Sequence, residues 1–171
     1  MRIIRSTMRK FRSFCRFPLF VKAWLAPTLV LLLLSKMMIF LFSFRRLTHL
    51  FGESMGVQPF LPILRSGQEV RAIRIAVLVN LASRYLPLDK SCFPQTITAR
   101  ILLGLYRIPY CIFFGVRKTD GRIDAHAWVF SGAYCVCGGR KSFWRFRVVA
   151  VFTTNGLIDK GCKSDGKSTH F

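Results

Sequence analysis

The chain has 171 residues and a formal net charge of +20, from 27 Lys and Arg against 7 Asp and Glu. Hydrophobic residues make up 52% of it, and 17 Phe exclude generic disorder, because disordered chains are poor in aromatic residues. This length favours one compact domain. Six Cys are too few for a disulfide-stapled mini-protein, and no segment resembles a cleaved signal peptide. We therefore expect free thiols in a reducing, cytoplasmic setting.

The positive charge is concentrated at the start of the chain. Residues 1–52 contain ten basic residues and no acidic one, and the first carboxylate is Glu53. Such a segment is attracted to acidic peptides, anionic lipid surfaces and nucleic acids alike, so charge alone does not choose among them.

An apolar run follows, over residues 23–44, with Lys36 as its one charge. As a helix it is long enough to cross a bilayer core of about 30 Å. However, Lys36 would cost about 2–3 kcal/mol near the bilayer centre, and basic residues flank both ends of the run. The alternative is a buried or half-buried helix that caps a soluble domain. Both interpretations stay open, and Pro27 is expected to kink or start the helix.

A long helix is predicted in the middle of the chain. Gly and Pro residues mark 52–65 as a linker. The capping-box pattern of Ser66 and Glu69 then starts a helix, which Pro87 stops. Apolar residues at helical spacing predict its core-facing stripe: Val70, Ile73, Val77 and Leu81.

The region that carries chemistry begins with Cys92. Pro94 suits the first turn of a helix, and Pro109 ends that helix, so Cys92 lies at or just before a helix N-terminus. The positive end of the helix dipole favours the thiolate, which is the nucleophilic form of cysteine.

An antiparallel meander of three strands is predicted next, over 110–116, 124–130 and 133–137. The two-residue alternation places His126 on one face with Trp128 and Phe130. A helix packed on this sheet can bring Cys92 to His126, which would act as base and acid. A Cys and a His this far apart are otherwise ordinary core residues.

The sequence motifs around Cys92 and His126 resemble those of the lasso-peptide B proteins, which are McjB-type leader peptidases of the transglutaminase-like cysteine protease superfamily. The motif AHAWV at 125–129 is the most specific of them. Other matches in the same order are Cys92-Phe93, Ala99, Leu102-Leu103, Ile108-Pro109 and Gly115-Val116, and, more weakly, Phe44-Arg45-Arg46-Leu47 and Arg84-Tyr85-Leu86-Pro87. This resemblance covers roughly residues 20–140. It also favours a soluble or peripheral N-terminal helix over a spanning one.

The resemblance implies an α+β, papain/transglutaminase-like core that bears Cys92 and His126 as catalytic residues and needs no cofactor. Residues 1–56 would form a basic, apolar helical region, 57–140 the peptidase core, and 141–171 a basic tail with one strand over 143–153. The implied function is removal of the leader peptide from a lasso-peptide precursor. The implied partners are that leader, a separate PqqD-like recognition protein and the ATP-dependent lasso cyclase.

Two departures from the family pattern concern structure and catalysis. Arg107 replaces a glycine, so it must hold a left-handed helix cap at a cost of about 1 kcal/mol, or the helix must end differently. The family's Asp, about a dozen residues after the histidine, is missing. Asp124 fits the orienting role poorly, and Asn155 or Asp159 could be supplied by the tail, so the third member stays unassigned.

The remaining Cys and His residues predict no metal site. Cys135 and Cys137 alternate along a strand, and no C-x-x-C pair occurs. Cys111 is expected to be inert core. Nucleic-acid binding is not expected, since no RNA-recognition signature is present. Two rival interpretations remain: a basic, membrane-anchored interaction protein, and an acyl-transfer enzyme of the same superfamily.

Overall fold

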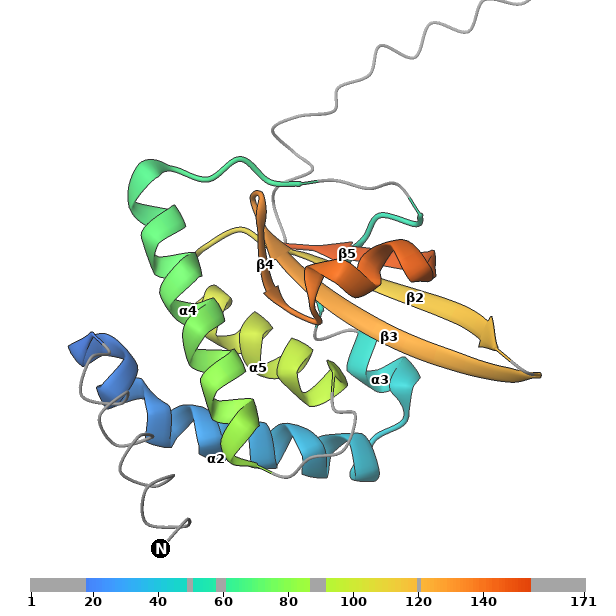
Figure 1. Cartoon of the computed structure of the whole chain (residues 1–171), viewed down its shortest axis with the longest axis horizontal. Helices are drawn as coiled ribbons and strands as arrows, with labels where there is room; N and C mark the ends of the chain where they lie inside the picture. Colours follow the sequence, from blue (N-terminus) through green and yellow to red (C-terminus); the bar gives the residue numbers. More distant parts are fainter. Residues whose placement is uncertain (1–17, 49–50, 58–60, 87–91, 120, 155–171) are drawn as a thin grey trace, which may run out of the picture.

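The computed structural model describes residues 18–48, 51–57, 61–86, 92–119 and 121–154. Helices and a sheet form separate layers, as predicted for an α+β protein (Figure 1). In chain order the elements are α2 (Leu19–Leu41), α3 (Phe44–Thr48), β1 (Glu53–Ser54), α4 (Ser66–Tyr85), α5 (Cys92–Leu105), β2 (Cys111–Thr119), β3 (Arg122–Ser131), β4 (Tyr134–Cys137), the 3₁₀ helix η1 (Arg140–Arg145) and β5 (Arg147–Thr153).

The sheet has five antiparallel strands in the order β1-β5-β2-β3-β4. The predicted meander is confirmed as β2-β3-β4. The strand expected over 143–153 is corrected at its start: η1 occupies the first residues, and β5 begins only at Arg147. This strand lies inside the sheet, between β1 and β2, so its residues help to build the core.

The two faces of the sheet are covered differently. Strand alternation sends Phe114 and Val129 into a large core shared with α4 and α5. Phe113 and Trp128 point to the opposite face, where Phe143 of η1 packs on them. The site residues are therefore held by two separate apolar clusters, one on each side of β3.

α2 confirms a helix over the apolar run and lies against both α4 and α5. Pro27 is inside this helix and does not start it. A buried hydrogen bond of 3.2 Å joins the hydroxyls of Ser35 and Thr98, and so ties α2 to α5. By length and composition α2 could cross a membrane, but a core helix or a signal sequence can have the same composition, so localisation stays a prediction.

The prediction of the core-facing stripe of α4 is wrong, because the helix is rotated about its axis and buries a different face. Val70, Ile73 and Val77 are exposed, whereas the buried positions are Ala72, Ile75, Leu78, Val79 and Ala82. α4 packs on α2, α5 and β4 through this second stripe, in which Ala72 and Ala82 are small enough to allow a close approach. Both stripes contain large apolar residues, so hydrophobicity alone does not indicate which of them is buried.

The start of α4 and the end of α5 test the capping signals that were read from the sequence. α4 starts at Ser66 as expected, but the capping box is displaced by one residue, because the Gln68 side chain accepts the backbone N–H of Arg65 (3.1 Å). At the end of α5, Arg107 has φ 52°, so it holds the left-handed cap itself. The N–H of Ile108 closes that cap on the carbonyl of Leu103 (2.9 Å).

Candidate active site

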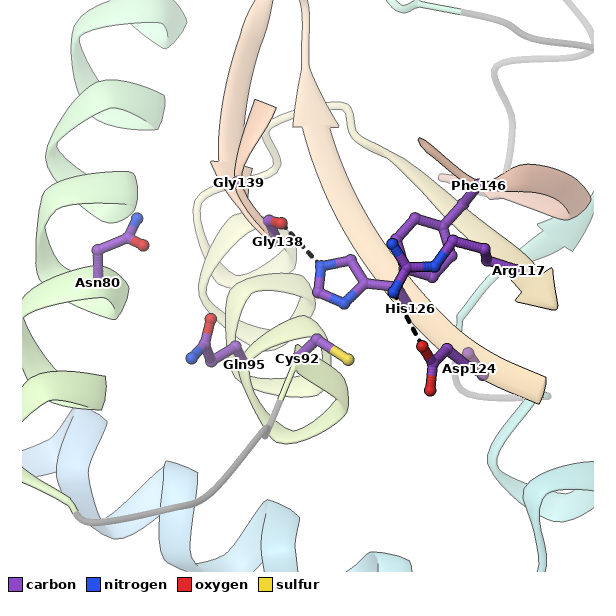
Figure 2. Close-up of a pocket in the computed structure, with 10 residues that line it drawn as sticks. Asn80, Cys92, Gln95, Arg117, Asp124, His126, Gly138, Gly139 and Phe146 are labelled. Atoms are coloured by element: carbon purple, nitrogen blue, oxygen red, sulfur yellow. Dashed lines mark hydrogen bonds and ion pairs between the residues drawn. The ribbon is translucent and has the colours of Figure 1, made fainter. Parts of the chain in front are cut away.

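Cys92 is the first residue of α5, and its half-buried thiol lies beside His126. Figure 2 shows the sulfur directed toward the imidazole of His126 on β3. The structure therefore brings together the two side chains that the sequence singled out, although 33 residues separate them along the chain.

The route by which they meet differs from the prediction. Trp128, two residues after His126, packs on the face of the sheet opposite to α5, and the two rings lie 4.6 Å apart. The pair therefore does not form across the helix–sheet interface. It forms at the edge of β3, where the backbone N–H of Ala127 also helps to lower the pKa of Cys92. β4 leaves this edge open, because its pairing with β3 ends at Val129 and Cys137.

The second ring nitrogen of His126 is held by the backbone. Nε2 lies 2.8 Å from the carbonyl oxygen of Gly138. A carbonyl can only accept, so Nε2 carries the hydrogen, and Nδ1 is the nitrogen that faces Cys92. Gly138 is twelve residues after His126, which is the distance at which the family pattern led us to expect an aspartate. A backbone carbonyl occupies the orienting position instead.

A side chain has no space at that position. Gly138 has φ +95°, a conformation that L residues rarely adopt, and an added Cβ would collide with the carbonyl oxygen of Ala127 and the ring of Trp128. The turn at Gly138 thus approaches β3 too closely for an aspartate side chain. The sequence signal that could have indicated it is the Gly138-Gly139 pair.

Ser142 of η1 fixes the Gly138 carbonyl from the other side. Its hydroxyl lies 3.0 Å from the Gly138 oxygen and 2.8 Å from the Gly139 oxygen, and it accepts the indole N–H of Trp128 (3.0 Å). Trp128, Ser142 and Gly138 therefore form a chain of hydrogen bonds that ends on His126. Sequence reasoning missed Ser142 entirely.

Aromatic rings support the imidazole. Phe146 stacks on His126 with ring centroids 5.4 Å apart, and both Phe146 and Trp128 belong to the second apolar cluster. Gly115, which pairs with His126 across β2 and β3, leaves space for the Trp128 ring, since an added Cβ would lie 2.8 Å from it. The orientation of the imidazole is therefore set by packing as well as by hydrogen bonds.

The electrostatics favour charge separation in the pair. Burial on its own would raise the pKa of Cys92, but the hydrogen bond and charge of His126, with the N–H groups of Ala127 and Cys92, lower it by more. The pKa of His126 is raised, chiefly by its hydrogen bond to Cys92, while burial opposes the shift and the Gly138 carbonyl adds to it. Both shifts favour the thiolate–imidazolium pair over the neutral thiol and imidazole.

The other described cysteines lie in different environments. Burial raises the pKa of Cys137 to about 12, which leaves it a neutral thiol near neutral pH. Cys111 is fully buried and Cys135 is half-buried. Within the described ranges, no group of three or more His, Cys, Asp or Glu side chains is arranged to hold a metal ion.

An open cavity of about 490 Å³ exposes the pair to solvent. Arg117 and Asp124 line it as an ion pair (2.9 Å), and the Arg117 guanidinium lies over the Phe146 ring. Gln95, one turn after Cys92, also lines this cavity, and Figure 2 shows its carboxamide between Asn80 and Cys92. Asn155 and Asp159, considered earlier as orienting residues, lie outside the described residues.

Fold and site together define an α+β protein with a cysteine at a helix N-terminus facing a strand histidine. A family model described as the transglutaminase-like superfamily matches residues 38–151, which is more than half of the chain. The chain belongs to the transglutaminase-like superfamily. No curated protein and no solved structure matches it significantly.

Proposed function

We propose that this chain is a cysteine peptidase that removes the leader peptide from a lasso-peptide precursor. The observation that supports a cysteine mechanism is that the Cys92 thiol faces His126, whose opposite imidazole nitrogen is held by the Gly138 carbonyl. The assignment of a lasso-peptide precursor as substrate rests on the family resemblance of the sequence motifs around Cys92 and His126, above all AHAWV at 125–129.

In the first half-reaction, the Cys92 thiolate attacks the carbonyl carbon of the scissile peptide bond and forms a tetrahedral intermediate. That intermediate collapses as the C–N bond breaks, and Nδ1 of the His126 imidazolium gives its proton to the departing amine. A thioester of the leader remains on the sulfur. The new amine belongs to the core peptide, on which the separate cyclase would act.

In the second half-reaction, neutral His126 takes a proton from water while the water oxygen attacks the thioester carbon. Cleavage of the C–S bond releases the leader carboxylic acid and restores the thiolate–imidazolium pair. An amine that reached the thioester in place of water would give acyl transfer, so the acceptor separates the peptidase from the acyl-transfer alternative.

Two donors are suited to stabilise the oxyanion of the tetrahedral intermediate. The backbone N–H of Cys92 is at the positive end of α5, where helix N–H groups have no partner within the helix. The Gln95 carboxamide lines the same cavity. We assign Gln95 as the side-chain donor, and its loss should lower kcat by about 10²-fold.

A polypeptide substrate is supported by a second cavity beside the first. It measures about 400 Å³, shares Asn80 with the cavity around Cys92, and is lined by Ile73 and Val77 of α4 and by Tyr134 of β4. An extended chain that crosses the site could place an apolar side chain there. The exposed Ile73 and Val77 of α4 thus gain a role in substrate binding.

The charge of the chain is consistent with a partner-assisted attraction of an acidic leader. A net charge of +20 raises the local concentration of anionic peptides, and this attraction should weaken with salt. The recognition protein and the cyclase remain proposed partners, on the basis of the family resemblance alone.

The decisive experiment combines substrate cleavage with labelling of the thiol. A lasso precursor peptide is incubated with the chain and its recognition protein, and the products are weighed by mass spectrometry. Wild type should release the leader, whereas Cys92→Ala and His126→Ala should lose about 10³-fold or more of the activity. Cys111→Ala, a matched change at a buried cysteine, should keep it.

Labelling with iodoacetamide near neutral pH tests the thiol without any substrate. Peptide mapping should find Cys92 alkylated fastest among the cysteines Cys92, Cys111, Cys135 and Cys137. Undiminished cleavage by Cys92→Ala would remove the proposed mechanism. Fast alkylation without cleavage, but with transfer of the leader to an added amine, would favour the acyl-transfer enzyme.

The second cavity is tested by a pair of substitutions on one helix. Val77→Lys introduces a charge into the cavity and should raise KM about tenfold with kcat little changed. Val70→Lys makes the same change at an exposed α4 position that is not among the residues lining either cavity, so KM should stay unchanged. Equal effects of the two variants would contradict the role of this cavity.

A further inference from the structure

α2 presents a continuous apolar stripe to its surroundings. The stripe consists of Leu19, Val30, Leu33, Met37 and Phe40, which are 81%, 55%, 47%, 56% and 79% exposed. Most of these positions recur three or four residues apart, so they lie along one side of the helix. Exposed apolar surfaces of this extent mark an interaction site.

The opposite side of α2 is more polar than the stripe. Thr28 and Ser35 are buried against the fold, where Thr28 donates to the Trp24 carbonyl (2.6 Å) and Ser35 pairs with Thr98 (3.2 Å). A surface helix in water normally has the reverse arrangement, with polar residues outward. The sequence therefore suits α2 to an apolar medium on its outer side.

The contacts of α2 with the domain exclude a spanning orientation while the fold is intact. α2 packs on α4 and α5, and its Trp24 ring contacts Tyr106 (5.8 Å), over which Arg71 of α4 lies (6.0 Å). A docked α2 that crossed the bilayer would carry α4 and the exposed Arg71 into hydrocarbon, which is strongly unfavourable. The helix can instead lie in the plane of the interface, with only the stripe in the lipid.

The basic residues of α2 and of the sequence next to it indicate which kind of membrane surface the stripe would bind. Lys22 and Lys36 are half-buried positions of the same helix, and residues 1–52 contain ten basic residues and no acidic one. Basic residues beside an apolar face favour anionic headgroups over zwitterionic ones. Figure 1 shows α2 along one border of the molecule, away from η1 and the β2–β3 hairpin.

We propose that the α2 stripe docks this protein on an anionic membrane surface as a peripheral helix that does not cross the bilayer. This inference does not depend on the proposed peptidase activity, because it uses other residues. It also chooses between the two interpretations of the apolar run over residues 23–44: the helix caps the domain and does not span the bilayer.

The test measures binding of the full chain to vesicles by flotation. Vesicles of phosphatidylcholine mixed with phosphatidylglycerol should bind the protein, and vesicles of phosphatidylcholine alone should bind it much more weakly. Leu33→Glu/Met37→Glu should weaken binding to the mixed vesicles at least about tenfold, while Cys92 alkylation stays at the wild-type rate. Ile123→Glu/Val149→Glu adds the same charge at exposed positions of β3 and β5, and should bind nearly as well as wild type.

Several results would overturn the proposal. Equal binding by the stripe variant would show that other residues hold the membrane, and vesicle-bound protein that resists alkaline, high-salt extraction would show a spanning helix. The wild type could instead fail to bind the mixed vesicles and form a dimer in light scattering, while the stripe variant is a monomer. That pair of results would show that the stripe binds a second copy of this chain. Each of these outcomes leaves the labelling test of Cys92 untouched.

Discussion

The two sides of β3 contribute to the site in different ways. The side covered by α5 supplies Cys92 through a helix start, which is a local feature of the backbone. The side covered by η1 supplies the environment of His126, through Gly138, Ser142 and Phe146. The thiol therefore depends on one helix, whereas the orientation of the imidazole depends on a turn, a short helix and a ring cluster.

This difference has a chemical consequence. A carboxylate beside Nε2 would stabilise the imidazolium by charge, whereas the Gly138 carbonyl offers only a dipole. More of the stabilisation of the pair must then come from the sulfur side, where the N–H groups of Ala127 and Cys92 face the thiolate. Substitutions on the two sides should therefore have separable effects.

The largest effect is expected from Gly138→Ala. Its Cβ would collide with Ala127 and Trp128, and its φ of +95° is strained for alanine, so the free energy of unfolding should fall by about 2–4 kcal/mol. Alkylation of Cys92 should also slow. Gly121→Ala is the matched control, because Gly121 has φ +77° with open space around it and should lose only about 1 kcal/mol. Denaturant titration that found equal losses would refute the packing argument.

The next effect concerns the pH profile of the thiol. In His126→Ala the lowering influences of the imidazole vanish while burial remains, so the pKa of Cys92 should rise above that of the wild type. Alkylation near neutral pH should slow about tenfold or more, and the rate should increase only at higher pH. In denaturant, wild type and variant should react alike. An unchanged profile in the folded state would show that His126 does not control the thiol.

A smaller effect is expected from Ser142→Ala. This change removes the hydroxyl that contacts the Gly138 carbonyl and accepts the Trp128 indole, so it should cost about 1–2 kcal/mol of stability and slow Cys92 alkylation several-fold. Ser83→Ala removes a comparable bond to the Asn80 carbonyl on the exposed side of α4 and should leave alkylation unchanged. If both variants slowed it, the effect would be general loosening of the fold.

The smallest effect lies on the helix side. Arg107→Gly relieves the left-handed cap of α5 and should raise the free energy of unfolding by about 1 kcal/mol without changing Cys92 alkylation. Arg74→Gly makes the same substitution inside α4 and should lower stability by a similar amount. Thermal unfolding measures both, and a loss of stability in Arg107→Gly would contradict the strain inferred from its φ angle.

Prediction from sequence was most successful where the signal is local. Pro94 and Pro109 bracket α5 and place Cys92 at its start, and strand alternation places His126 beside Trp128. Prediction failed where several apolar stripes competed. On α4 the stripe through Val70 and Val77 was predicted to face the core, but contacts with α2, α5 and β4 bury the stripe through Ala72, Ile75 and Val79 instead.

The sequence by itself determined the thiol at a helix start, the histidine-bearing strand and the basic, apolar N-terminal helix, because capping, alternation and hydropathy act over a few residues. Only the tertiary structure decided how the pair meets at the open edge of β3, and that a carbonyl of Gly138 holds the imidazole. Every residue has a backbone carbonyl, so the sequence does not indicate which one orients the imidazole, and the Gly138-Gly139 pair is only an indirect sign of it. The register of β4 and the close approach of its final turn select which carbonyl is used.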